Sequence, residues 1–238
     1  MTLDSSVRIG LLLPDVLGTY ADGGNATVLA QRLRWRGVPA EVLSCPASEE
    51  PPTGCEIYLL GGGEDAAQLF AADWLRERPA LCRALAGPAV TLAVCAGLQI
   101  LGHTLTDAAG QPRPGAGLLD LATRPRAGRA TGEITTECLL PGVGRLSGFE
   151  NHRGVTTLGP DARPLGRVLR GVGNGDRGRW GRGGEGARAG RIFGTYLHGP
   201  VLARNPALAD HLLTLATGSE LAELEVADQA ALRRQYLG

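Results

Sequence analysis

Apolar runs and amphipathic segments alternate along the first 105 residues of the chain. Residues 7–13 form a continuous apolar run closed by Pro14, which is typical of a buried central strand. The same pattern predicts further strands at 40–45, 56–60 and 89–94, and helices at 26–36, 64–86 with a break near Pro79, and 98–105. This alternation predicts an α/β fold, a doubly wound and mostly parallel sheet flanked by helices, with ligands at the carboxyl ends of the strands.

Beyond residue 106 the apolar pieces become shorter, and turns separate them. We expect strands at 118–122, 131–139, 155–158, 168–169 and 191–197, which add antiparallel hairpins to the sheet. Residues 171–190 hold nine glycines in twenty positions without periodicity and are predicted to form a glycine-rich hairpin or loop. Helices are expected at 205–216 and 221–236. We therefore predict one domain over residues 1–238.

The charge composition excludes several kinds of chemistry. All 24 cationic side chains other than histidine are arginines, and 24 acidic residues balance them. Without lysine the chain can build neither a Walker A loop nor a Schiff base. With no net charge it has no overall basic field, so nucleic acid is not an expected partner. Residues 113–191 hold 14 arginines against 7 acids, either a solvated surface or a face that attracts an acidic partner or anionic substrate.

Targeting and disulfide signals are missing from the sequence. Residues 1–8 lack the cationic start and apolar run of a signal peptide, and the nearly apolar stretch 88–101 is too short to cross a bilayer. We expect a cytoplasmic protein without a transmembrane segment. Its odd number of cysteines and the absence of Cys-x-x-Cys spacing argue against a disulfide framework or a metal site, although a bridge between Cys45 and Cys55 stays open.

Cys95 stands at the junction between the strand predicted at 89–94 and the helix that follows it. The neighbours Ala96 and Gly97 are small, and a thiol on such a turn is held at the carboxyl edge of the sheet. The helix N-terminus there lowers a thiol pKa, which favours a nucleophile. The alternative is that Cys95 is a small buried apolar residue, as free cysteines often are.

A thiolate nucleophile needs a base, and His198 is the best placed of the four histidines. It ends an apolar strand just before a Gly-Pro turn, which would bring it to the same sheet edge as Cys95. His103 and His211 are expected inside helices, with structural roles. His152 is expected in a polar loop at 148–154, where it either joins the site or caps a turn, and the role of Glu150 in the same segment stays open.

These residues resemble a known family. Cys95-Ala-Gly-Leu-Gln99 resembles the Cys-x-Gly-x-Gln elbow of class I, triad-type glutamine amidotransferases, and residues 195–200 resemble their histidine segment. Further segments are similar to the CobB/CobQ-type branch, and within it to the GatD-like glutaminase subunits: 14–25, 61–65, 148–154 and 205–210. The resemblance spans about residues 7–215.

The resemblance implies a role for each matching residue. Cys95 would attack the amide carbon of L-glutamine, and His198 would protonate the departing ammonia and then activate water. The implied substrate-binding groups are the backbone N–H groups of Ala96 and of Gly62 or Gly63, which would stabilise the oxyanion, and the side chains of Gln99 and Arg129. Many relatives place a glutamate two residues after the histidine, but Pro200 stands there. The third catalytic group must therefore come from elsewhere, or from a partner.

The resemblance also implies a partner. GatD-like subunits supply ammonia to a MurT-like, ATP-dependent Mur ligase, with which they form a heterodimer that amidates the D-glutamate α-carboxyl of lipid II in peptidoglycan synthesis. ATP and Mg²⁺ would then belong to the ligase, and this chain would hold no cofactor. No room for a nucleotide domain precedes the first strand, so activation of the carboxylate is expected on another polypeptide. Two alternatives stay open, namely another acceptor such as a corrinoid, and a catalytically silent binding module.

Overall fold

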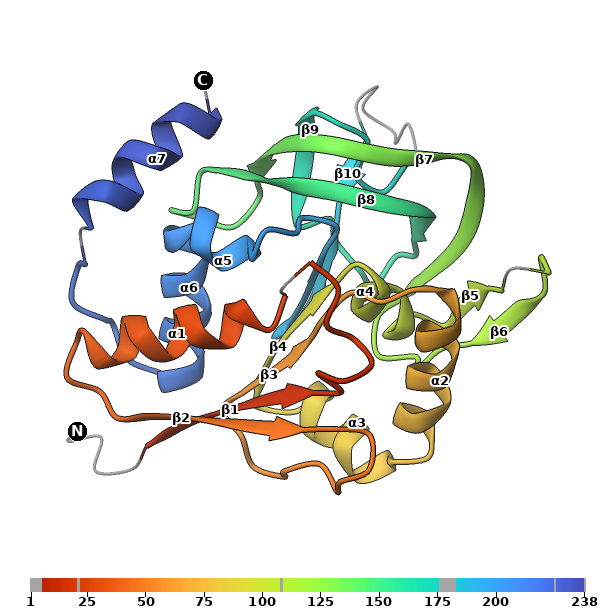
Figure 1. Cartoon of the computed structure of the whole chain (residues 1–238), viewed down its shortest axis with the longest axis horizontal. Helices are drawn as coiled ribbons and strands as arrows, with labels where there is room; N and C mark the ends of the chain where they lie inside the picture. The colour runs from red at the N-terminus through yellow and green to blue at the C-terminus, as the bar shows by residue number, and fades with distance from the viewer. Residues whose placement is uncertain (1–5, 21, 108, 176–182, 225, 238) are drawn as a thin grey trace.

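The computed structural model describes residues 6–20, 22–107, 109–175, 183–224 and 226–237 (Figure 1). A six-stranded sheet has the strand order β11-β12-β4-β3-β1-β2. Its strands are β1 (Val7–Leu12), β2 (Ala40–Cys45), β3 (Ile57–Leu60), β4 (Val90–Val94), β11 (Ala187–Ala189) and β12 (Ile192–Thr195). All neighbours are parallel except β11, which pairs antiparallel with β12. The predicted α/β fold with a mostly parallel sheet is confirmed.

Helices cover both faces of this sheet. The chain crosses from β1 to β2 in one direction and from β3 to β4 in the other, so right-handed connections place their helices on opposite faces. In Figure 1, α1, α5 and α6 lie on one side and α2 and α3 on the other. Their bounds are α1 (Gly24–Arg34), α2 (Asp65–Arg76), α3 (Pro79–Ala86), α5 (Val201–Arg204) and α6 (Pro206–Thr217). Every residue of β3, β4 and β12 is buried, as expected for central strands covered on both faces.

The second half of the chain builds a separate sheet, which corrects the expectation that it would mostly extend the first. The strand order is β10-β9-β7-β5-β6, and β8 pairs with β7. The strands are β5 (Thr104–Thr106), β6 (Pro112–Pro114), β7 (Leu121–Cys138), β8 (Arg145–Leu158), β9 (Gly166–Arg170) and β10 (Gly184–Glu185). Only β11 and β12 join the first sheet, so the glycine-rich segment passes from one sheet to the other.

The long hairpin of β7 and β8 contains the segments that the sequence pattern misjudged. The strand predicted at 131–139 and the last two residues of the one predicted at 118–122 belong to the single strand β7, whose pairing with β8 shifts register between Pro125 and Ala130. Residues 148–154 lie within β8 and are not the expected polar loop. Both strands contain many polar residues, so the hydrophobic pattern does not mark them fully as strands. Backbone pairing between the two strands holds the hairpin together.

The bounds of two helices also differ from the prediction. The helix after Cys95 is the short α4 (Ala96–Ile100), because a Cβ on Gly102 would lie 2.3 Å from Leu121 and the chain turns there into β5. His103 therefore lies outside a helix. The terminal helix α7 (Ala227–Leu237) begins six residues later than expected. Residues 176–182 of the glycine-rich segment lie outside the described residues. No helix in the described part of the chain is long and apolar enough to span a membrane.

Candidate active site

Cys95 occupies a strained turn between β4 and α4. Its backbone has φ 53° and ψ −104°, a conformation that a residue with a side chain rarely adopts and that active sites often retain. The backbone N–H of Cys95 donates to the carbonyl of Thr195 (2.8 Å), which ties the turn to β12. A Cβ on Gly97 would lie 3.0 Å from Leu60, so the small residue after the elbow permits close packing on β3. The predicted strand-to-helix junction is confirmed.

His198 lies at the same edge of the sheet as Cys95. Strands β12 and β4 are parallel neighbours, with Thr195 opposite Val94, and His198 follows three residues after β12. The imidazole is almost completely buried. Its Nε2 atom has no hydrogen-bond partner among the described residues and is thus available for a proton transfer. The predicted common edge for the two residues is confirmed.

Asp22 supplies the carboxylate that the sequence did not locate. Its Oδ2 and Oδ1 atoms lie 3.0 Å and 3.2 Å from Nδ1 of His198, and both side chains are buried. Asp22 comes from the loop after β1. The sequence had left open whether the third group comes from elsewhere in this chain or from a partner. The position of Asp22 after the first strand could have indicated this role, because loops that follow parallel strands meet at the edge where ligands bind.

The three side chains surround Gly62. A Cβ built on Gly62 would lie 2.8 Å from Cε1 of His198, 3.1 Å from Oδ2 of Asp22 and 3.4 Å from Cβ of Cys95. Burial by itself lowers the pKa of His198, but the Asp22 carboxylate and the neighbouring Cys95 thiol raise it to about 9. The imidazole is therefore protonated at neutral pH and carries a proton that it can donate.

A cavity of about 370 Å³ opens over these groups. Apart from Gly62, all the site residues expected from the sequence line it: Gly63, Cys95, Ala96, Gln99, Arg129 and His198. The N–H of Gly62 already donates to Asp22 Oδ2 (2.9 Å). Within the described chain, the N–H groups of Gly63 and Ala96 have no acceptor, as is usual for Ala96 at a helix start. Gly63 is therefore the better of the two glycine candidates for an oxyanion donor.

Comparison with known proteins identifies the family. A family model described as the CobB/CobQ-like glutamine amidotransferase domain matches residues 8–206. The chain belongs to this glutamine amidotransferase family. The Staphylococcus aureus subunit GatD of lipid II isoglutaminyl synthase (glutamine-hydrolyzing) is 34% identical over 206 residues, 86% of this chain and 82% of that protein. Its Streptococcus pneumoniae counterpart is 32% identical over 220 residues, 88% of this chain and 80% of that protein.

Solved structures show the same fold. A Thermotoga maritima glutamine amidotransferase matches with a TM-score of 0.53 at 19% identity, over 98% of this chain and 90% of that one. The glutaminase domain of Trypanosoma brucei CTPS with bound acivicin matches with a TM-score of 0.55 at 10% identity, over 94% and 99%. The glutamine amidotransferase fold expected from the sequence is confirmed.

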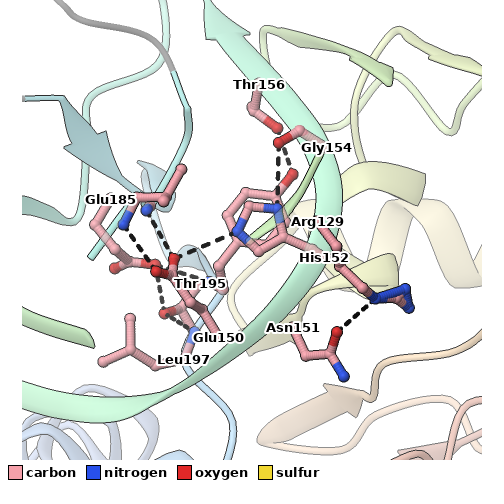
Figure 2. A network of polar contacts seen from close by, with 12 residues as sticks. Arg129, Glu150, Asn151, His152, Gly154, Thr156, Glu185, Thr195 and Leu197 are labelled. Carbon is pink, nitrogen blue, oxygen red and sulfur yellow. Dashed lines mark hydrogen bonds and ion pairs between the residues drawn. The ribbon is translucent and has the colours of Figure 1, made fainter. Parts of the chain in front are cut away.

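Side chains from four segments meet at the mouth of this amidotransferase cavity. Arg129 donates from Nε to Oδ1 of Asn151 (2.6 Å), as Figure 2 shows, and its guanidinium lies 3.9 Å from Glu64. Asn151 also donates to the Tyr20 hydroxyl, and the Tyr20 ring lies 4.8 Å from the His198 ring. Sequence reasoning missed Tyr20 and Asn151, because the pairing of β7 with β8 brings Asn151 to Arg129, and Tyr20 reaches Asn151 from the loop after β1. The role of Arg129 in binding substrate stays a prediction.

Gln99 forms part of the cavity wall and is fixed from both ends. Its amide oxygen accepts a hydrogen bond from Gln68, and its amide nitrogen donates to the Tyr196 hydroxyl (2.9 Å). A Cβ on Gly154 would lie 2.4 Å from that nitrogen, so a glycine is needed across the cavity wall. Gln99 keeps one amide hydrogen and one lone pair for a ligand, and its contact with substrate stays a prediction.

The other histidines have distinct surroundings. His152 is buried on β8, lines the cavity and stacks on Tyr196 at 3.8 Å, so it contributes to the wall of the site. Its Nε2 lies 3.5 Å from Glu150, whose carboxylate accepts the N–H groups of residues 172 and 173. His103 is exposed beside Asp120, and His211 lies in α6 as predicted. Among the described residues, no three His, Cys, Asp or Glu side chains gather as a metal site would require.

Replacing Gly62 with alanine is expected to lower glutamine hydrolysis by about 10²-fold, because the added methyl would displace the His198 ring from its place between Asp22 and Cys95. Steady-state ammonia release measures this change, with thermal unfolding to verify the fold. Gly128→Ala is the matched control, since a Cβ there would meet no atom of the described chain within 4 Å. Equal activity of the two variants would contradict the proposed geometry.

Proposed function

We propose that this chain is the glutaminase subunit of a lipid II isoglutaminyl synthase and hydrolyses L-glutamine to glutamate and ammonia. The observation that carries the proposal is the set of Cys95, His198 and Asp22 at one cavity, on an elbow with φ 53°. It agrees with the Staphylococcus aureus and Streptococcus pneumoniae relatives, which are the glutamine-hydrolyzing GatD subunits of lipid II isoglutaminyl synthase. The retained nucleophile and base argue against a catalytically silent module.

The first half of the reaction forms a thioester. The Cys95 thiolate attacks the amide carbon of glutamine, and the carbonyl oxygen becomes an oxyanion that the N–H groups of Ala96 and Gly63 stabilise. The carbon–nitrogen bond then breaks while the His198 imidazolium donates its Nε2 proton to the leaving nitrogen, which departs as ammonia. Neutral His198 and a γ-glutamyl thioester on Cys95 remain.

The second half regenerates the thiolate. Neutral His198 takes a proton from water, the hydroxide oxygen attacks the thioester carbon, and the carbon–sulfur bond breaks to release glutamate and the Cys95 thiolate. Throughout, Asp22 accepts the Nδ1–H of His198 and stabilises the imidazolium form. Every group in this cycle belongs to the described chain, and no lysine or nucleotide takes part.

The ammonia would serve a separate ligase subunit. We assign ATP and Mg²⁺ to a MurT-like Mur ligase in a heterodimer, where the D-glutamate α-carboxyl of lipid II is activated and then amidated. The absence of a Walker A loop and of lysine supports this division of labour. The five cysteines are free thiols, which is in keeping with the cytoplasmic location that we propose.

Ammonia release is expected from the purified chain with glutamine alone, because nucleophile, base and carboxylate are all present in it. Adding the MurT-like ligase, ATP, Mg²⁺ and lipid II should convert the released ammonia into amidated lipid II, which mass spectrometry detects. No ammonia in either mixture would contradict the glutaminase assignment. Ammonia without amidated lipid II, together with amidation of a corrinoid by another synthetase, would instead contradict the proposed acceptor.

A further inference from the structure

Glu185 is a carboxylate in the protein interior that the catalytic cycle does not use. Its exposed fraction is 0%, and it lies on β10, just before the turn at Gly186 through which the chain enters the first sheet. Burial raises its pKa to about 7. Within the described residues no cation is paired with it, so it is retained at the desolvation cost of a buried acid. Such a group needs an explanation in its contacts.

The hydrogen bonds of the Glu185 carboxylate go to the segment that ends at His198. Its Oε1 atom accepts the Thr195 hydroxyl (2.7 Å) and the backbone N–H of Tyr196 (2.7 Å), as Figure 2 shows from Glu185 to Thr195. The Thr195 hydroxyl oxygen in turn accepts the N–H of Leu197 (3.0 Å). One carboxylate oxygen thus holds Thr195 and Tyr196 directly and Leu197 through the Thr195 hydroxyl.

The segment has a second anchor on its far side. His198 and Phe149 exchange two backbone hydrogen bonds, of 2.8 Å and 3.1 Å. The sheet ladder of β12 ends at Thr195, whose carbonyl accepts the N–H of Cys95. Between that ladder and the Phe149 bridge, residues 196 and 197 run outside a regular strand. Glu185 accepts the N–H of Tyr196 directly, and the Thr195 hydroxyl that donates to Glu185 accepts the N–H of Leu197.

We propose that Glu185 is a positioning residue for His198, acting through the Thr195 hydroxyl and the backbone of residues 196 and 197. The proposal rests on the proposed function, because His198 matters as an acid and base there. Without the carboxylate, the buried Tyr196 N–H and the Thr195 hydroxyl lose their acceptor, and the hydroxyl oxygen that accepts the Leu197 N–H is no longer held in place. The segment would then relax, and the imidazole would leave its place between Asp22 and Cys95. A glutamine at 185 still offers an oxygen to the same donors, whereas alanine offers none.

The experiment compares Glu185→Gln, Glu185→Ala and Thr195→Val in the full chain. We expect Glu185→Ala and Thr195→Val to lower kcat by about 10-fold to 10²-fold with little change in the KM for glutamine, because a small misplacement of a catalytic group costs up to about 10²-fold. Glu185→Gln should keep kcat close to that of the unchanged protein. A purely structural acid would change the unfolding temperature without this split between kcat and KM.

A second measurement reads the position of His198 without any need for activity. Nitrogen-15 NMR of labelled histidines follows the titration of His198, which Asp22 and Cys95 face and which the Tyr20 ring covers. The pKa of His198 should fall in Glu185→Ala and Thr195→Val and stay near that of the unchanged protein in Glu185→Gln. If Glu185→Ala does not fold, Thr195→Val decides, since it is isosteric and removes only the hydroxyl.

An unchanged titration of His198 in Thr195→Val, with unchanged kcat, would overturn the positioning role. So would a Glu185→Gln variant that loses as much activity as Glu185→Ala in folded protein, because the charge and not the acceptor would then be needed. If the unchanged protein hydrolyses no glutamine, the proposed function fails by itself. The NMR titration still decides whether Glu185 positions the imidazole.

Discussion

Replacing Cys95 with alanine is expected to lower glutamine hydrolysis by at least about 10⁴-fold, because loss of a catalytic nucleophile leaves only the binding and oxyanion contributions. The N–H groups of Ala96 and Gly63 would remain at the cavity, but no atom would form the thioester. The substitution removes one sulfur at a site that is already small and buried, so the fold should persist. Ammonia release coupled to a spectrophotometric readout measures the loss.

A matched control for this variant is Cys82→Ala. Cys82 lies on α3, is partly buried and does not line the cavity, and burial raises the pKa of its thiol. Its replacement should leave hydrolysis unchanged. In the unchanged protein, the glutamine analogue diazo-oxo-norleucine should modify Cys95 and no other cysteine, as peptide mass spectrometry would reveal. Modification of a different cysteine, or activity that survives Cys95→Ala, would refute the assignment of the nucleophile.

Replacing Asp22 with asparagine should have the next largest effect, a fall in kcat of about 10³-fold to 10⁴-fold. Asparagine keeps the shape of the side chain but loses the negative charge that stabilises protonated His198. Burial, which lowers the pKa of His198, would no longer be offset by the Asp22 charge. The pKa of His198 should therefore fall well below its present value of about 9. Less imidazolium would be present at neutral pH to protonate the departing ammonia.

The pH dependence of kcat gives the sign of this effect. An imidazolium is needed in the first half-reaction, so the activity of the unchanged protein should decline as the pH rises past about 9. In Asp22→Asn the same decline should begin at lower pH. Asp15→Asn is the matched control, because Asp15 lies in the same loop, is exposed and, among the described residues, accepts only the N–H of Ala47. Identical profiles for both variants would show that the third group comes from elsewhere, such as the partner.

Within the first sheet, the sequence pattern predicted the strands well, because strands buried on both faces appear in the sequence as continuous apolar runs. The strand at 40–45 has the observed bounds of β2, and the break at Pro79 separates α2 from α3. The elbow at Cys95 and the place of His198 could be predicted for the same reason. Parallel strands share one carboxyl edge, so residues that follow β4 and β12 must meet there.

The second sheet was hard to predict because its strands carry little hydrophobic alternation. Residues 145–154 include the polar run Glu150-Asn151-His152-Arg153, which looks like a loop, but its first three residues pair with β7. The pattern also continued a helix past Ile100, where Gly102 and the close approach of Leu121 stop it. In both places a backbone contact with a distant strand outweighed the local preference of the sequence.

By itself, the sequence determined the fold class, the family and the strand ends that carry Cys95 and His198, because these depend on local periodicity and on short motifs at strand ends. Only the tertiary structure decided that Asp22 is the hydrogen-bond partner of His198 and that the Gly62 N–H donates to Asp22. It also decided that the Glu185 carboxylate binds the segment leading to His198. These contacts join residues 11 to 176 positions apart. No spacing rule selects one aspartate or glutamate from 24 acids, so the choice waits for the packing of the two sheets.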